Sequence, residues 1–299
     1  MRRFYQEWNP GEFALSVVRI TNEICAEMKA QGYDLTLRQL YYQFVARGYL
    51  PNKQREYKRL GDIVNRGRLS GRIDWAFIED RTRNLASWAA YNSPGDLIRR
   101  NQYQYGVDHW IDQDVRIEVW VEKEALVGVV GRTAGRWRVP YFACRGYVSQ
   151  SELHSAAQRH IRHENGGQDV VVLHLGDHDP SGIDMTRDIE ERLELFGAST
   201  TVKRLALNMD QVEQYNPPPN PAKTTDSRAG GYIREYGRQS WELDALSPAT
   251  IDAIIDTAIA ERVDLAEFEA RAEVERLGQD QLGKTADNWA AVEEFVEAL

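Results

Sequence analysis

The stretch of sequence that decides the fold is Leu173-His174-Leu175-Gly176-Asp177-His178-Asp179-Pro180-Ser181-Gly182. The apolar run at residues 170–175 predicts a buried strand, and a Pro-Ser-Gly turn with a helical pattern follows the two acids. Strand side chains alternate between faces, so Asp177 and Asp179 are expected to point to the same side. Two neighbouring carboxylates repel each other, and a divalent cation with oxygen ligands relieves that repulsion.

A second predicted strand, residues 116–121, also ends in an acid. Glu122 follows its last residue and precedes an apolar helical pattern. In parallel sheets the carboxyl ends of the strands form the edge where ligands bind. Glu122, Asp177 and Asp179 are therefore predicted to bind Mg²⁺, with Mn²⁺ as the alternative ion. The competing interpretation is a solvated acidic loop beside an unrelated glutamate.

Residues 115–207 show four strand patterns separated by three helical patterns. This order predicts an α/β fold with a mainly parallel sheet and helices on both of its faces. A Pro-, Gly- and Asn-rich loop is expected at residues 216–231, followed by a helical C-terminal extension.

The first third of the chain predicts three helices and a β wing. Helical periodicity covers residues 12–31, a second helix runs from an N-cap at Thr36 to Ala46, and a third starts near Lys53. Residues 69–80 are expected to form the wing. The pattern is that of a winged helix-turn-helix, and a plain helical bundle is the alternative.

Charge is unevenly distributed along the 299 residues. The chain has a net charge of −9, but residues 1–100 hold 17 Lys and Arg against 11 Asp and Glu. The last 59 residues hold 15 acids against 4 bases, which predicts a solvated acidic face. The basic first third favours duplex DNA as a partner. The predicted phosphate contacts are Lys123 and a basic stripe on the third helix, formed by Lys53, Arg55, Lys58, Arg59 and Arg66. The alternative for the stripe is a solvated helix face, and the alternative for Lys123 is an ordinary surface lysine.

The composition also bears on location. The two cysteines, Cys25 and Cys144, lie far apart without metal-ligand spacing, which favours a reduced, cytoplasmic protein. No window is apolar enough to span a membrane, and the N-terminus lacks the apolar core of a signal peptide.

Two adjacent tyrosines lie on the second predicted helix. The apolar stripe comprises Leu37, Leu40, Tyr41, Phe44 and Val45, which assigns Tyr41 to the core. Tyr42 lies about 100° further round the helix, at the edge of the polar face, with Arg38 one turn before it. A tyrosine there is usually an ordinary surface residue. Tyrosine is also a nucleophile in phosphoryl transfer, and Arg38 could lower its pKa or hold a phosphate.

These motifs together resemble a known family. Glu122, the turn at residues 145–147 and the Asp-x-Asp pair at residues 177–179 resemble the Toprim metal-binding domain. A winged helix with Arg38-x-x-Tyr-Tyr42 before a Toprim domain resembles the topoisomerase VI A subunit and the related meiotic transesterases. The Asp-Pro-Ser-Gly at residues 179–182 and, more weakly, the run at residues 241–246 resemble blocks of the same family.

The resemblance implies a winged-helix domain at residues 1–105 and a Toprim domain with C-terminal helices at residues 106–299. It implies that Tyr42 attacks DNA with help from Arg38 and forms a 5′-phosphotyrosyl link. It further implies a homodimer in which the tyrosine of one subunit faces the metal site of the other. An ATPase B-type subunit is an additional expected partner, although the chain itself has no such nucleotide-binding pattern.

Two other functions remain open. A Toprim nuclease would use metal-activated water and leave no covalent intermediate, with Tyr42 serving only as a DNA contact. A DNA-binding module with a decayed site is the non-enzymatic alternative, and the three acids argue against it. A primase fits poorly, because the chain lacks a zinc-binding set of cysteines.

Overall fold

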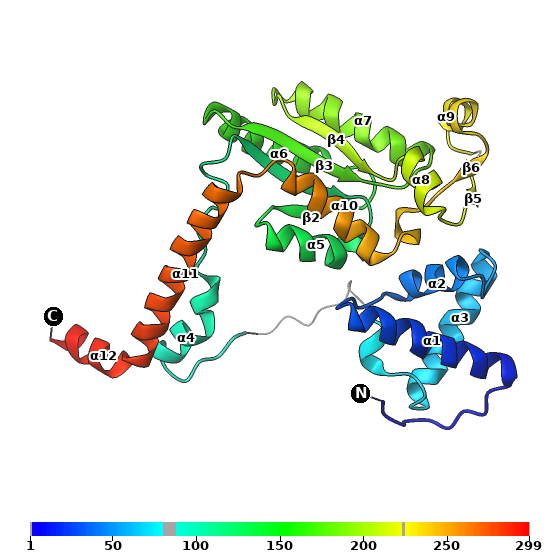
Figure 1. Cartoon of the computed structure of the whole chain (residues 1–299), viewed down its shortest axis with the longest axis horizontal. Coiled ribbons are helices and arrows are strands. Elements are labelled where there is room, and N and C mark those ends of the chain that lie inside the picture. Colours follow the sequence, from blue (N-terminus) through cyan, green and yellow to red (C-terminus); the bar gives the residue numbers. More distant parts are fainter. Residues whose placement is uncertain (1, 80–87, 223–224, 299) are drawn as a thin grey trace.

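A computed structural model describes residues 2–79, 88–222 and 225–298 (Figure 1). It shows a unit of three N-terminal helices, a sheet with helices on both faces, and a helical arm that projects away from the sheet. The N-terminal helices are α1 (Glu12–Ala30), α2 (Leu37–Ala46) and α3 (Gln54–Leu69). All three were predicted, and the predicted bounds, which for α3 were a start only, agree within a residue.

Helix α2 begins where the sequence predicts. The Thr36 side chain accepts a hydrogen bond from the Gln39 backbone, and the Gln39 side chain accepts one from the Thr36 backbone. This capping box satisfies two backbone N–H groups that have no partner within the helix. It therefore fixes the start of the helix that carries both tyrosines.

The predicted β wing is wrong within residues 69–79. The segment forms a short 3₁₀ helix, Trp75–Phe77, and makes only two isolated β-bridges, from Ser70 to Phe4 and from Ile78 to Leu35. The aromatic residues that suggested a strand instead cover the helices, since Arg68 stacks on the Trp75 ring. Residue 80, the last of the predicted wing, lies outside the described residues.

The prediction of a parallel sheet is confirmed. Its four strands run in the order β2-β1-β3-β4, and every neighbouring pair is parallel. The strands are β1 (Val115–Val121), β2 (Tyr141–Ala143), β3 (Asp169–Leu175) and β4 (Thr201–Ala206). Val121 and Leu175 are in register, so the residues after β1 and β3 emerge side by side at one edge.

Helices cover both faces of the sheet. Ile117, Val119 and Val121 pack in one core with helices α5 (Val127–Arg136) and α10 (Pro248–Ala260). Trp120 points to the opposite face and packs with α6 (Gln150–Asn165) and α7 (Pro180–Leu195). The alternation of side chains along a strand thus supplies two separate cores.

The remaining elements complete the domain and the arm. Around the sheet lie η3 (Glu124–Leu126), α8 (Met209–Tyr215), the antiparallel pair β5 (Asn220–Pro221) and β6 (Gln239–Ser240), α9 (Ala229–Tyr236) and η4 (Leu243–Ala245). The arm comprises α4 (Pro94–Asn101), η2 (Gln102–Gln104), α11 (Leu265–Asp287) and α12 (Trp289–Glu297), with α4 packed on α11 (Figure 1). None of the described helices has the length and apolarity needed to cross a membrane.

The N-terminal unit joins the sheet domain through α2. This helix packs against η4, and Ala245 of η4 belongs to the hydrophobic core of the three helices. The loop that follows β6 therefore lies between the sheet edge and the tyrosine-bearing helix.

One buried ion pair stabilises the sheet. Glu118 on β1 accepts hydrogen bonds from Arg159 at 2.7 and 2.9 Å and from the Trp120 indole at 2.9 Å, and it lies 3.3 Å from His160. Burial alone would raise the pKa of Glu118. The hydrogen bonds and charges of His160 and Arg159 outweigh this effect and lower the pKa of Glu118 to about 2.

We predict that Glu118→Gln lowers the free energy of unfolding by about 2–3 kcal/mol at pH 7. Because the folded pKa lies below the unfolded value, this stability is present above about pH 4.5 and is lost as pH falls towards 2. Chemical denaturation across that range measures it. Equal stability of variant and wild type at pH 7 would show that the pair contributes nothing.

Candidate active site

The ends of β1 and β3 bring the first two predicted acids together. Glu122 Oε2 accepts a hydrogen bond of 2.8 Å from the Asp177 backbone N–H. Asp179 caps α7 and accepts a 2.7 Å bond from Gly182 N–H. A side chain at Gly182 would collide with the Asp177 carbonyl, so α7 can start this close to the acids only with glycine there.

The Asp177 side chain turns away from the other two predicted ligands. It contacts Lys123 Nζ at 2.8 Å and accepts a 2.8 Å hydrogen bond from Leu243 N–H. Burial raises the pKa of Asp177 to about 7, despite the opposing charge of Lys123. Loss of the Lys123 charge would raise the pKa of this carboxyl further.

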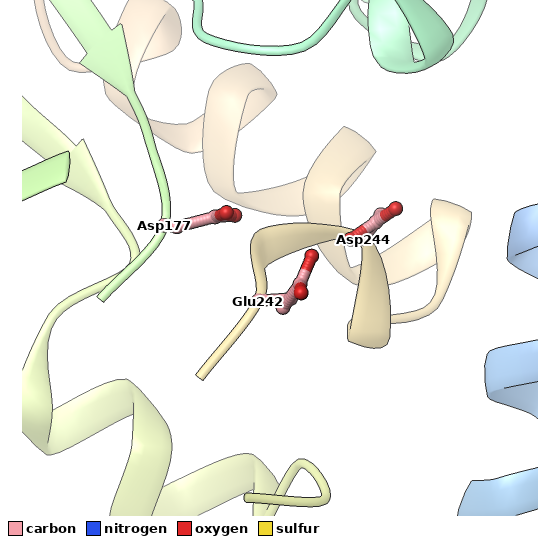
Figure 2. Close-up of side chains that lie close together, drawn as sticks. All are labelled: Asp177, Glu242 and Asp244. Carbon is pink, nitrogen blue, oxygen red and sulfur yellow. The ribbon is translucent and has the colours of Figure 1, made fainter. Parts of the chain in front are cut away.

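A tight group of three acids exists, but it is not the predicted one. Within the described residues, Asp177, Glu242 and Asp244 place ligand oxygens within 4.8 Å of one another (Figure 2). Glu122 and Asp179, which were predicted as ligands, are not members of this group. Each accepts a hydrogen bond from a backbone N–H instead, from Asp177 and Gly182 respectively. The group of three could bind a metal ion through carboxylate oxygens.

Lys123 lies among these three carboxylates. Its Nζ is 2.8 Å from Asp177, 2.5 Å from Glu242 and 3.0 Å from Asp244. Burial lowers the pKa of Lys123, but the three acids outweigh it and raise the pKa above the usual value. The alternative of a surface lysine is thus wrong, since its ammonium is largely buried among the acids.

Arg38 binds the same acids from the side of α2. Its Nη2 lies 2.5 Å from Glu242 Oε2 and its Nε lies 2.8 Å from Asp244 Oδ2. The guanidinium carbon is also 5.7 Å from the centre of the Tyr42 ring. Arg38 therefore links the tyrosine helix to the acidic group.

The prediction that Tyr42 lies at an exposed edge is wrong. Only 4% of this residue is exposed, because the sheet domain covers the side of α2 that the N-terminal helices leave open. Burial raises the pKa of Tyr42, and the charges of Asp244 and Glu242 raise it further. Helical periodicity could distinguish the apolar face of α2 from its polar face. It could not reveal that the sheet domain also packs against this helix.

Tyr41 occupies the core, as predicted. Its hydroxyl accepts a 2.7 Å hydrogen bond from Lys53 N–H and lies 3.2 Å from the Pro51 carbonyl. This tyrosine thus holds the loop between α2 and α3. Within the described part of the chain, the Tyr42 hydroxyl makes no such hydrogen bond to the backbone of this loop.

A cavity of about 400 Å³ lies between α2 and the sheet edge. It is lined by Arg38, Tyr41, Tyr42, Asn52, Gln54, Tyr57, Asp177, Asp179, Asn220, Pro221, Ser240, Trp241 and Glu242. A second hollow of about 360 Å³ is lined by Glu122, Lys123 and Arg145, and Arg38 borders both. Of the predicted acids, Asp177 and Asp179 face the first cavity and Glu122 faces the second.

The predicted basic face of α3 is exposed. Its five side chains lie on the surface, and Arg59 also stacks 3.7 Å from the centre of the Phe13 ring. The face consists of Lys53, Arg55, Lys58, Arg59 and Arg66. Their exposure leaves them available for contacts with an anionic partner.

The sequence missed Glu242 and Asp244. They follow a β-bridge between His178 and Trp241, whose backbones exchange hydrogen bonds of 2.8 and 2.9 Å. His178 is buried beside this bridge, and its Nδ1 lies 2.7 Å from the Tyr232 hydroxyl. The sequence signal at these positions was the weak resemblance of residues 241–246 to a block of the topoisomerase VI A family, which did not mark the two acids as ligands.

No protein-family model matches the chain, and no curated protein matches it.

We predict that Lys123→Ala destabilises the protein by about 3 kcal/mol, because three carboxylates lose the cation between them. Millimolar Mg²⁺ should then raise the melting temperature of the variant more than that of the wild type, because a bound cation stabilises the folded state. Scanning calorimetry with and without Mg²⁺ measures both effects.

Lys203→Ala, which removes an exposed lysine from β4, is the matched control and should show neither effect. A Lys123 variant as stable as the wild type, or one that ignores Mg²⁺, would contradict a cation site at these acids.

Proposed function

We propose that this protein is a Mg²⁺-dependent DNA-cleaving transesterase similar to the topoisomerase VI A subunit. In this proposal the three N-terminal helices act as the DNA-binding unit of a winged-helix type, and the sheet domain acts as a Toprim domain. The proposal makes the protein an enzyme of the isomerase class.

One observation carries the proposal. Tyr42 and Arg38 from α2 line the same cavity as Asp177 and Asp179 from the end of β3. A phenol nucleophile, a guanidinium and a pair of acids are the groups that phosphoryl transfer to tyrosine requires. The cavity assembles them within one chain, whereas the family resemblance implies a tyrosine supplied by the partner in a homodimer.

The chemistry would proceed as a transesterification. The Tyr42 oxygen attacks a backbone phosphorus, the bond from phosphorus to O3′ breaks, and the 5′ phosphate stays on the tyrosine. The phenol loses one proton and the departing O3′ gains one. The phosphodiester bond energy is conserved in the phosphotyrosyl link, so the reverse reaction can reseal the strand.

The donor set at the sheet edge fits Mg²⁺. Asp177, Glu242 and Asp244 offer only carboxylate oxygens, which hard divalent cations prefer, and Mn²⁺ accepts the same ligands. When bound, such an ion supplies positive charge that stabilises the phosphate during displacement. Asp177, Glu242 and Asp244 would hold the ion, and Lys123 Nζ, which contacts all three acids, supplies positive charge there when no ion is bound.

The exposed basic face of α3 supports DNA as the substrate. Five cations on one helix can neutralise backbone phosphates without reading sequence. Asn52, at the end of the loop before α3, also lines the cavity. Duplex DNA lying along α3 would thus pass close to Tyr42. A homodimer and an ATPase B-type subunit belong to the same proposal, and we place the reaction in the cytoplasm.

We predict that purified protein incubated with supercoiled plasmid and Mg²⁺ forms a DNA adduct that survives detergent. Tyr42→Phe should abolish the adduct because it removes the nucleophile. Asp177→Asn should reduce cleavage at least 100-fold, on the scale typical for loss of charge stabilisation at a phosphoryl-transfer site. Gel electrophoresis before and after proteinase digestion measures adduct and cleavage.

Tyr57→Phe is the matched control, since Tyr57 lines the same cavity and the variant should keep the adduct. Cleavage without any adduct, undiminished in Tyr42→Phe, would instead identify a metal-dependent nuclease. Absence of both DNA binding and cleavage would reject the proposed function.

A further inference from the structure

Glu242 is an anion held by two cations at the wall of the cavity. Its Oε2 lies 2.5 Å from Arg38 Nη2 and 2.5 Å from Lys123 Nζ. About a quarter of its side chain is exposed, and it lines the cavity that also contains Tyr42. The carboxylate therefore fills the position in which both cations can bind one anion together.

Asp244 contacts the same two cations but has a different role. Its side chain is fully buried, and it binds Arg38 Nε at 2.8 Å and Lys123 Nζ at 3.0 Å. Unlike Glu242, it does not line the cavity. Asp244 thus holds the two cations from the protein interior, while Glu242 contacts them on the side that faces the cavity.

The backbone around Glu242 is fixed, so its side chain can leave alone. The preceding residue, Trp241, is paired with His178 in a β-bridge, and Leu243 N–H donates to Asp177. Rotation of the Glu242 side chain about its own bonds would free Arg38 Nη2 and Lys123 Nζ from this carboxylate without moving either neighbour. An arginine and a lysine fixed in this way suit a phosphate group, which accepts several charge-assisted hydrogen bonds.

We infer that Glu242 occupies the place of a DNA phosphate and competes with DNA for Arg38 and Lys123. The inference rests on the proposed function, because it takes a phosphodiester as the ligand of this cavity. In the metal-free protein the Glu242 carboxylate pairs with both cations and occupies this position. A DNA phosphate entering beside Tyr42 displaces the carboxylate and takes over its two partners.

Charge favours this exchange once Glu242 is neutral. Two cations face three carboxylates in the observed arrangement, so the group carries an excess negative charge that opposes an incoming phosphate. Glu242→Gln removes one of these charges but keeps the shape and hydrogen-bonding groups of the side chain. DNA would then meet Arg38 and Lys123 without an ionised competitor.

The test measures binding of a short fluorescent duplex by anisotropy, in EDTA and at fixed salt. All proteins carry Tyr42→Phe, so that no strand is cleaved. Glu242→Gln should bind the duplex about five- to tenfold more tightly than the Tyr42→Phe parent. Glu242→Ala should change affinity in the same direction. Glu213→Gln removes an exposed acid on α8 outside the cavity and should leave affinity unchanged.

Circular dichroism and the melting temperature verify that each variant is folded. If only one of the two Glu242 variants folds, the affinity of that variant decides the test. Affinity equal to or weaker than that of the parent overturns the inference, while the proposed function stands if the parent binds and the unmodified protein forms its adduct. Absence of DNA binding by the parent and by both Glu242 variants overturns the inference and the proposed function together.

Discussion

The arrangement of this protein depends on four charged side chains that meet between the N-terminal helices and the sheet. Arg38 comes from α2, Lys123 follows β1, and Glu242 and Asp244 lie in the loop before α10. Each cation contacts both acids, so the network ties three segments that are distant in sequence. Asp244 is fully buried, and a buried charge is tolerated only when it is paired. Its contacts with Arg38 and Lys123 therefore constrain how the N-terminal helices meet the sheet domain.

The same network sets the chemical state of the cavity. Burial is the largest cause of the raised pKa of Tyr42, and the acids that bind Arg38 raise it further. Both effects oppose deprotonation of the phenol. In the free protein the Tyr42 phenol is thus protonated, and the neighbouring Arg38 and Lys123 are already paired with acids. Under the proposed function, activation of this phenol would therefore require new positive charge or the loss of negative charge near it. The proposed metal ion and the displacement of Glu242 each supply one of these changes.

Much of this fold follows from local sequence, and much of the site does not. The strands ending at Glu122 and Asp177 could be predicted, because apolar runs that end in acids and lead into helices define a parallel sheet and its ligand edge. The burial of Tyr42 could not be predicted. Helical periodicity identifies the apolar face of α2 that packs on the other N-terminal helices, but it gives no sign that the sheet domain packs on another side of the same helix. Glu242 and Asp244 resemble ordinary solvated acids along the chain, and only the β-bridge from Trp241 to His178 brings them to the sheet edge.

A double-mutant cycle on Arg38 and Asp244 tests the central claim most directly. The free energies of unfolding of Arg38→Ala, Asp244→Ala and the double variant would be compared with that of the wild type. If these side chains are paired as described, the account predicts a coupling energy of about 1–3 kcal/mol, with the second substitution costing little once the first is present. Additive effects, with a coupling energy near zero, would contradict it and would separate the tyrosine helix from the acids.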